Sequence, residues 1–157
     1  MNLLLRDEQF LLYAQEIIYT ATKSVDISTF KLEMSSKPRG RPLMRFFETL
    51  YQKRKQGVAI RLLSPVSSRI IHWPASNSPA LEVLKKNNIE VRHLRNNRCC
   101  HAKIIIVDNK VGIIGSHNLS VKSCHYNFEI SYMENEALFV KRLSCIYNHA
   151  WNTAQNS

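Results

Sequence analysis

The stretch HAKIIIVDNKVGIIGSHN, residues 101–118, decides the fold, because it places two apolar runs of strand length on either side of a turn. The runs cover residues 102–107 and 111–114, and both are rich in isoleucine and valine. Runs of this length and composition are typical of buried strands. Asp108-Asn109-Lys110 between them has the composition of a turn. The stretch therefore predicts two strands joined by a tight turn, with polar side chains at their outer ends.

The flanking sequence alternates between helical and strand patterns. Apolar residues recur at helical spacing over about residues 7–22, 43–56, 80–87 and 138–151. Strands are predicted over residues 24–31, 58–63, 89–94 and 128–133, and loops over residues 35–42 and 66–78. This alternation predicts an α/β fold, a mixed β-sheet flanked by helices on both faces. We expect the 157 residues to form a single domain, 1–157, with one copy of the 101–118 motif.

The charge of the chain indicates the kind of partner. Lys and Arg number 22 against 12 Asp and Glu, which gives a net charge of +10. Such an excess favours a polyanion, either nucleic acid or an anionic membrane surface, and we rank nucleic acid first. No window approaches the ~20 apolar residues of a membrane span, and the N-terminal apolar run is too short for a signal peptide. We therefore expect a cytoplasmic protein without stable membrane association.

The cysteines predict reduced thiols and no metal site. Cys99, Cys100, Cys124 and Cys145 do not form a disulfide framework in a chain of this size. A zinc site formed by Cys99, Cys100 and His101 is disfavoured, because no second ligand pair has suitable spacing. No cluster of carboxylates with metal-binding spacing accompanies the motif. We expect no metal and no cofactor.

Four side chains of the 101–118 stretch suit the chemistry of a phosphate ester. His101 and Lys103 are two positions apart, so on a strand they point to one face, roughly 7 Å apart at the backbone. Ser116 and Asn118 add neutral donors, and preorganised groups of this kind stabilise a negatively charged transition state. His101 is the predicted nucleophile, because it is poised near neutral pH and Ser116 has no evident base. Gly115 is expected to let the backbone approach a ligand closely.

The spacing H-x-K-x4-D-x6-G-S-x-N resembles the motif of the phospholipase D superfamily. The resemblance implies a phospholipase D-like sandwich, attack by His101 at phosphorus and a covalent phosphohistidine. It agrees with a structural role for Asp108, whose side chain is expected to order the Asp-Asn-Lys turn. It also implies that Glu129 hydrogen-bonds the catalytic histidine.

The same resemblance bears on the assembly. In this superfamily the leaving oxygen is protonated by the histidine of a second motif copy, and small single-motif members are nucleases that form homodimers. The chain carries one copy. We therefore expect a homodimer with one active site between the two chains.

Further basic residues are assigned from their positions alone. Five arginines are expected to contact the phosphate backbone: Arg39, Arg41, Arg92, Arg95 and Arg98. His117, at the variable position of the motif, either lines the site or lies exposed in a turn. The other histidines are assigned to the surface or the core: His72, His93, His125 and His149.

The function predicted from these observations is a metal-independent phosphodiesterase, an endonuclease that acts on DNA or RNA with little sequence preference. Two alternatives stay open. The first is a phospholipase D or phosphatidyltransferase that acts on lipid with the same histidine chemistry. The small size, the single motif and the lack of an amphipathic membrane-binding segment argue against it. The second is a non-catalytic nucleic-acid-binding subunit, against which the intact motif argues.

Overall fold

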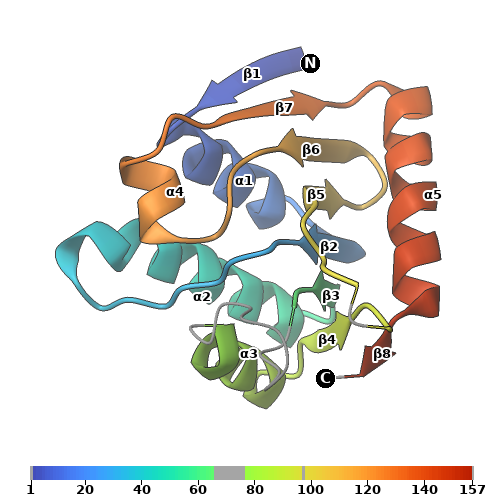
Figure 1. Cartoon of the computed structure of the whole chain (residues 1–157). Helices are drawn as coiled ribbons and strands as arrows, with labels where there is room; N and C mark the ends of the chain where they lie inside the picture. Colours follow the sequence, from blue (N-terminus) through green and yellow to red (C-terminus); the bar gives the residue numbers. More distant parts are fainter. Residues whose placement is uncertain (1, 66–76, 97, 157) are drawn as a thin grey trace.

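The computed structural model describes residues 2–65, 77–96 and 98–156, and this part of the chain forms one sheet with helices on both faces (Figure 1). The strands are β1 (Asn2–Arg6), β2 (Ser24–Ser28), β3 (Ala59–Leu63), β4 (Glu90–His93), β5 (Lys103–Val107), β6 (Val111–Gly115), β7 (Ile130–Glu134) and β8 (Gln155–Asn156). The helices are α1 (Gln9–Tyr19), α2 (Arg41–Lys55), α3 (Asn77–Lys86), α4 (Val121–His125) and α5 (Ala137–Thr153), with a short 3-10 turn, η1 (Pro38–Gly40).

The sheet has the strand order β1-β7-β6-β5-β2-β3-β4-β8. Strands β2, β3 and β4 are parallel, whereas β5, β6 and β7 form an antiparallel meander. The β5–β6 hairpin pairs Lys103 with Gly115 and Val107 with Val111. Its turn places Asp108 and Asn109 at φ 53°, in the left-handed region that Asp and Asn tolerate better than most residues. The two strands predicted from residues 101–118 are therefore confirmed as neighbours.

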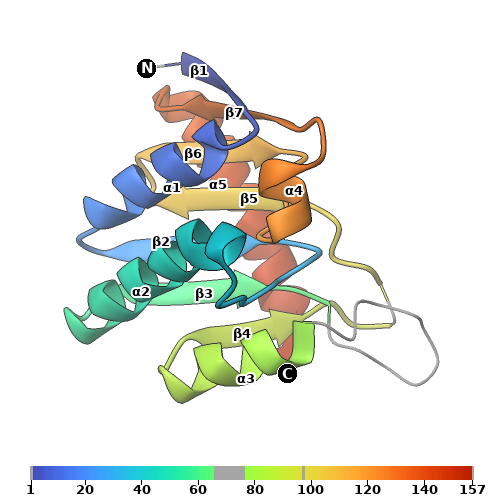
Figure 2. The same ribbon diagram turned by 90° about the vertical axis from the view of Figure 1, so that its left-hand side faces the viewer.

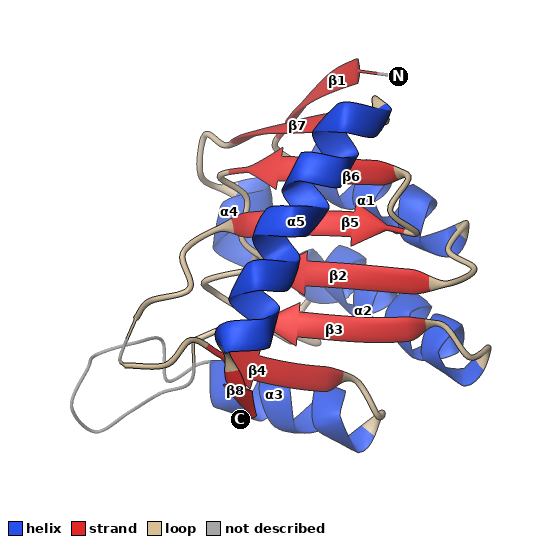
Figure 3. Ribbon diagram, turned by 90° about the vertical axis from the view of Figure 1, so that its right-hand side faces the viewer, coloured by secondary structure: helices blue, strands red, loops and turns tan. Residues whose placement is uncertain are grey.

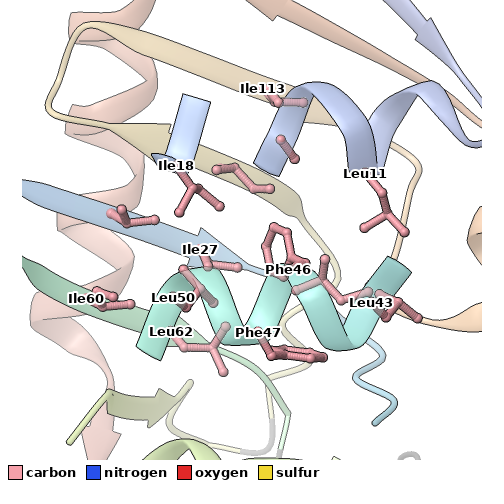
Figure 4. Packing of buried hydrophobic residues seen from close by; sticks show 14 of the residues in the cluster. Leu11, Ile18, Ile27, Leu43, Phe46, Phe47, Leu50, Ile60, Leu62 and Ile113 are labelled. Atoms are coloured by element: carbon pink, nitrogen blue, oxygen red, sulfur yellow. The ribbon is translucent and has the colours of Figure 1, made fainter. Parts of the chain in front are cut away.

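Two hydrophobic cores cover the two faces of the sheet. Helices α1, α2, α3 and α4 lie on one face (Figure 2), and α5 crosses the other face (Figure 3). Figure 4 shows Phe46 and Leu50 of α2 packed toward the strands. Every residue of β5 is buried, because alternate side chains enter opposite cores: Ile105 and Val107 face α1 and α2, and Ile104 and Ile106 face α5. The predicted mixed sheet with helices on both faces is confirmed.

Some elements were absent from the sequence prediction. Strand β1 pairs antiparallel with β7, more than a hundred residues away, and β8 pairs with β4. Helix α4 is a short helix that begins after the cap Ser120, whose side chain accepts from the Ser123 amide. Residues 35–42 were predicted as loop, but α2 already begins at Arg41. Most of the predicted 66–78 loop, with His72, lies outside the described residues.

One edge of the sheet brings the motif residues together. Gly115, at the end of β6, lies beside Lys103 at the start of β5 and Ser131 in β7. Ser28, at the end of β2, pairs with Ile104. Side chains that precede β5 or follow β2 and β6 therefore meet at this edge. None of the helices in the described ranges is long and apolar enough to cross a bilayer.

Candidate active site

His101 and Lys103 form a direct pair at the start of β5. His101 lies two residues before the first residue of β5 and is exposed, whereas Lys103 is 8% exposed. The Lys103 Nζ lies 3.0 Å from Nδ1 and 3.3 Å from Nε2 of His101, and it donates to the His101 carbonyl at 2.5 Å. The predicted placement of both side chains on one side is confirmed. The ammonium therefore lies against the edge of the imidazole, within reach of both ring nitrogens.

Lys103 titrates in an unusual setting. Burial lowers the pKa of its ammonium below the ordinary lysine value, and the Glu129 carboxylate partly opposes this effect. Its Nζ also lies 5.7 Å from the centre of the Phe30 ring. The positive charge is therefore held in a partly desolvated position beside the histidine, where it interacts more strongly with an anion than it would in water.

The segment that follows β2 contacts both halves of the motif. The Phe30 ring packs against the His101 ring, with centres 4.8 Å apart. The amide of Lys31 donates to Oδ1 of Asn118 at 3.0 Å, and the Thr29 hydroxyl lies 3.5 Å from the same oxygen. The side-chain oxygen of Asn118 is thus occupied, and its side-chain NH2 group is the part that remains to meet a ligand. Phe30 was missed from the sequence, where its only signal was its place at the end of a predicted strand.

Gly115 and Ser116 contact β7 rather than an open ligand site. A Cβ at Gly115 would lie 2.3 Å from Oγ of Ser131, so the glycine permits close approach of β7. The close approach that Gly115 permits in this structure is that of β7, whereas the sequence suggested the approach of a ligand. The Ser116 hydroxyl donates to the Ile130 carbonyl at 3.3 Å and accepts from the Ile130 amide at 3.1 Å. Ser116 is nevertheless exposed at the site edge.

Glu129 contacts the motif by a different route from the one expected. The hydrogen bond predicted between Glu129 and His101 is not among those made by the described residues. Its Oε1 instead accepts from Ser123 at 3.1 Å and from Asn127 at 2.9 Å. The Ser123 hydroxyl in turn accepts from the backbone N–H of Asn118 at 2.8 Å. Glu129 therefore connects to Asn118 through Ser123, a residue of α4 that no local pattern indicated.

The charge state of Glu129 follows from these contacts. Burial raises the pKa of its carboxyl, but hydrogen bonds with Ser116, Asn127 and Ser123 outweigh this and lower the pKa below its ordinary value. Glu129 is thus ionised at neutral pH, within the electrostatic reach of Lys103. An anion and a cation are both held behind the exposed edge.

Asp108 lies at the opposite end of the hairpin from the site. Its carboxylate accepts four hydrogen bonds of 2.7–2.9 Å from the loop before β2: from the amides of Thr22, Lys23 and Ser24 and from the Thr22 hydroxyl. Burial raises its pKa, but these bonds outweigh burial and lower the pKa to about 2. The side chain was expected to order its own turn, and instead it holds a neighbouring loop.

His117 is neither a lining residue nor an exposed turn residue. It is 1% exposed, its ring stacks on Phe10 at 4.5 Å, and its Nδ1 lies 2.8 Å from Oγ of Ser131. Burial lowers the pKa of His117, and the nearby Glu129 partly opposes this effect. His117 therefore anchors the chain between Ser116 and Asn118 in the core under α1.

The five arginines fall into different settings. Arg92 packs over the Trp151 ring at 4.5 Å and donates to the Trp151 carbonyl, so its guanidinium supports α5. Arg39 donates to the hydroxyl of Tyr126 and lies over its ring. The other three, Arg41, Arg95 and Arg98, are exposed. All four cysteines are free, and no three His, Cys, Asp or Glu side chains of the described ranges are grouped to hold a metal.

Comparison with protein families gives a match over most of the chain. The family model described as cardiolipin synthase, PLD-like domain matches residues 15–151. Cardiolipin synthase A from Buchnera aphidicola is 27% identical over 133 residues, which cover 83% of this chain and 25% of the relative. The chain thus spans about a quarter of the length of the curated relatives that it matches.

Comparison with solved structures gives matches to proteins of nearly the same length as this chain. Nuc from Salmonella typhimurium, described as a phospholipase D family member, superposes with a TM-score of 0.79 at 19% identity, covering 100% of this chain and 97% of the other. NucT from Helicobacter pylori gives a TM-score of 0.76 at 18% identity, with 100% and 99% coverage. At this identity the likeness concerns the fold.

Proposed function

The chain belongs to the family of phospholipase D-like domains, and from this premise we propose that it is a metal-independent phosphodiesterase that cleaves nucleic acid. One observation carries the proposal: an exposed imidazole has the Lys103 ammonium within 3.3 Å of both its ring nitrogens. This arrangement offers a nucleophile and a fixed positive charge to a single phosphate.

The chemistry follows from the positions of these groups. A ring nitrogen of His101 attacks phosphorus and forms an N–P bond, while the bond from phosphorus to the leaving oxygen breaks. Lys103 and the amide of Asn118 balance the charge on the non-bridging oxygens. The leaving oxygen takes a proton from a second acid. Water then hydrolyses the phosphohistidine, and that second group, now a base, accepts the proton of the water.

A second copy of the chain is the proposed source of the acid. His101 is the histidine of the one motif in residues 1–157, and it serves as the nucleophile. A symmetric dimer would place a second His101 across the phosphate. Mixing wild-type chains with His101→Ala chains tests this sharing. If both chains contribute His101 to one site, a mixed dimer keeps a single His101 and is inactive, so activity falls as the square of the wild-type fraction, whereas independent sites give a linear fall.

Nucleic acid is preferred over lipid on grounds of charge. The net charge of +10 and the exposed Arg95 and Arg98, six and three positions before His101 in the sequence, favour a long polyanion over a single headgroup. The curated relatives are cardiolipin synthases, which makes a phosphatidyl group the second candidate substrate. Both substrates require the same histidine chemistry, so the residues of the motif alone do not choose between them.

One experiment tests the proposal directly. Wild type and His101→Ala are given labelled DNA, RNA and phosphatidylglycerol vesicles in EDTA. We expect nucleic acid to be cleaved by wild type only. Turnover of lipid with no cleavage of nucleic acid would replace the substrate class, and activity abolished by EDTA would contradict the metal-free mechanism.

A further inference from the structure

A cavity of about 350 Å³ lies against His101 on the α5 side of the sheet. One wall is the connection from β4 to β5, from which Leu94 and Ala102 line the cavity. The other wall is the second half of α5. Its floor consists of buried apolar side chains, among them Leu63 and Tyr147. None of the steps proposed for His101, Lys103 and Asn118 uses this cavity.

The lining of the cavity defines what can enter. Its floor carries no acidic or basic group, so it does not suit the phosphate itself. Polar side chains lie at the rim, where Arg98, His149 and Thr153 are exposed. An occupant must therefore be uncharged, with a polar edge, and attached to a phosphate that lies at His101.

The surface beyond the rim favours a chain of phosphates. A second hollow shares Arg98, His149 and Thr153 with the cavity and continues to Arg95 and Asn152. Two exposed guanidinium groups thus lie along one path that begins at His101. A neighbouring phosphate of a nucleic-acid strand would find a cation there, whereas phosphatidylglycerol, with one phosphate, has none to place there.

The volume of the cavity also favours a nucleoside over a phospholipid. A volume of about 350 Å³ lies at the lower end of the ~300–1,000 Å³ typical of pockets that enclose a drug-sized ligand. One nucleoside fits such a space, while the two acyl chains of a phospholipid exceed it. We propose that this cavity is a nucleoside subsite, which holds the base next to the scissile phosphate. The proposal deepens the proposed function and rests on it for the substrate class.

Two cysteines offer a binding test that does not depend on catalysis. Cys99 is exposed and lines the cavity, whereas Cys145 is exposed on α5 outside it. Alkylation of each thiol by iodoacetamide is followed by mass spectrometry with AMP, ribose 5-phosphate or dihexanoyl phosphatidylglycerol present. We expect AMP to slow the alkylation of Cys99 several-fold and to leave Cys145 unchanged. Equal protection by ribose 5-phosphate, protection by the lipid instead, or no protection would each overturn the subsite.

A kinetic test measures the contribution of the base. A dinucleoside phosphate is compared with the same diester lacking both bases. We expect wild type to prefer the former roughly tenfold in kcat/KM, the effect of one stacked base. Ala150→Trp, which fills the cavity, should bring this ratio toward one, and Cys145→Trp on the same helix should retain it. Melting curves check folding, and Ile146→Trp at the rim replaces Ala150→Trp if that variant is unfolded.

The outcomes separate the two proposals. If wild type cleaves both diesters equally well, the subsite is wrong and the nuclease assignment stands. If wild type cleaves neither diester nor any longer nucleic acid, the proposed function fails. In that case the protection of Cys99 still decides whether the cavity binds a nucleoside.

Discussion

The two ends of the β5–β6 hairpin carry residues of one motif, yet they differ in how their polar groups are used. At the turn, the Asp108 carboxylate accepts four hydrogen bonds from residues 22–24, and its capacity is filled. At the open end, His101 is exposed, and its imidazole faces one ammonium. A filled acceptor thus stabilises the fold, whereas a group with remaining capacity is available to a ligand.

Substitutions at the open end should lower catalytic activity more than stability. His101→Ala removes the proposed nucleophile, so we expect cleavage in EDTA to fall by more than about a thousandfold. The stability should change by about 0.5 kcal/mol or less, because the side chain is exposed. Cleavage rate and melting temperature measure the two effects. A variant that retains its cleavage rate would refute the assignment of His101.

Lys103 gives a pH test of the same end. Its pKa is lowered by burial, so its positive charge is lost at a lower pH than that of an ordinary lysine as the pH rises. The alkaline decline of kcat/KM should therefore begin below the ordinary lysine range. Lys103→Ala should lower kcat/KM by about a hundredfold. Lys103→Arg retains the charge and should move the decline to higher pH; an unchanged profile would exclude Lys103 as its source.

Glu129 tests whether the open end needs an internal support. Glu129→Ala and Ser123→Ala each break the route to Asn118, and we expect each to lower kcat by about tenfold. The double variant should lose little more than either single variant, because both act through the same contact. Asn127→Ala, which removes only the other donor to Oε1, is the matched control. Additive losses would show that the two residues act separately.

The turn end should fail in stability rather than in chemistry. Asp108 has a pKa of about 2, below its ordinary 3.8, so the ionised form stabilises the fold above about pH 4 and this is lost as the pH falls through 2. Asp108→Asn should lower the free energy of unfolding at neutral pH by about 1–2 kcal/mol and reduce its dependence on acid pH. Urea titrations across pH measure this. A loss of kcat in folded Asp108→Asn would contradict the purely structural role of the turn end.

The smallest effect concerns two arginines that are close in sequence. Arg98 is exposed at the cavity rim, whereas Arg92 packs on Trp151. Arg98→Ala should reduce the salt dependence of nucleic-acid binding by about one unit of slope. Arg92→Ala should lower the melting temperature and leave the slope unchanged. Fluorescence anisotropy across salt concentrations separates them, and equal slopes for both variants would contradict the assignment of Arg98.

Local patterns were sufficient for the elements that carry their own signal. The isoleucine runs of β5 and β6 and the apolar stripe of α5 could be placed from their periodicity. Strand β1 could not, because five residues are held there by pairing with β7, a contact that leaves no local trace. Helix α4, with five residues, is also too short for periodicity to reveal.

Within the candidate site, a contact could be predicted only where the two residues are close in the sequence. His101 and Lys103 are two positions apart, and this spacing predicted that their side chains lie together. The contact of Phe30 with His101 and the connection of Glu129 to Asn118 through Ser123 join segments that are distant in the chain or lie on different elements. Residue types alone cannot indicate such contacts, since many serines and phenylalanines have the same local sequence properties.

The sequence by itself determined which groups the candidate site has available: a histidine just before β5, a lysine at its start and an asparagine after β6, in a strongly basic chain. Only the tertiary structure decided which partners these groups have. In the structure, His117 is buried in the core, Asp108 accepts hydrogen bonds from the loop before β2, and a cavity lies beside His101. The physical reason is that spacing fixes which side chains share a strand face, whereas burial and hydrogen bonding depend on segments that meet only when the sheet and its helices pack.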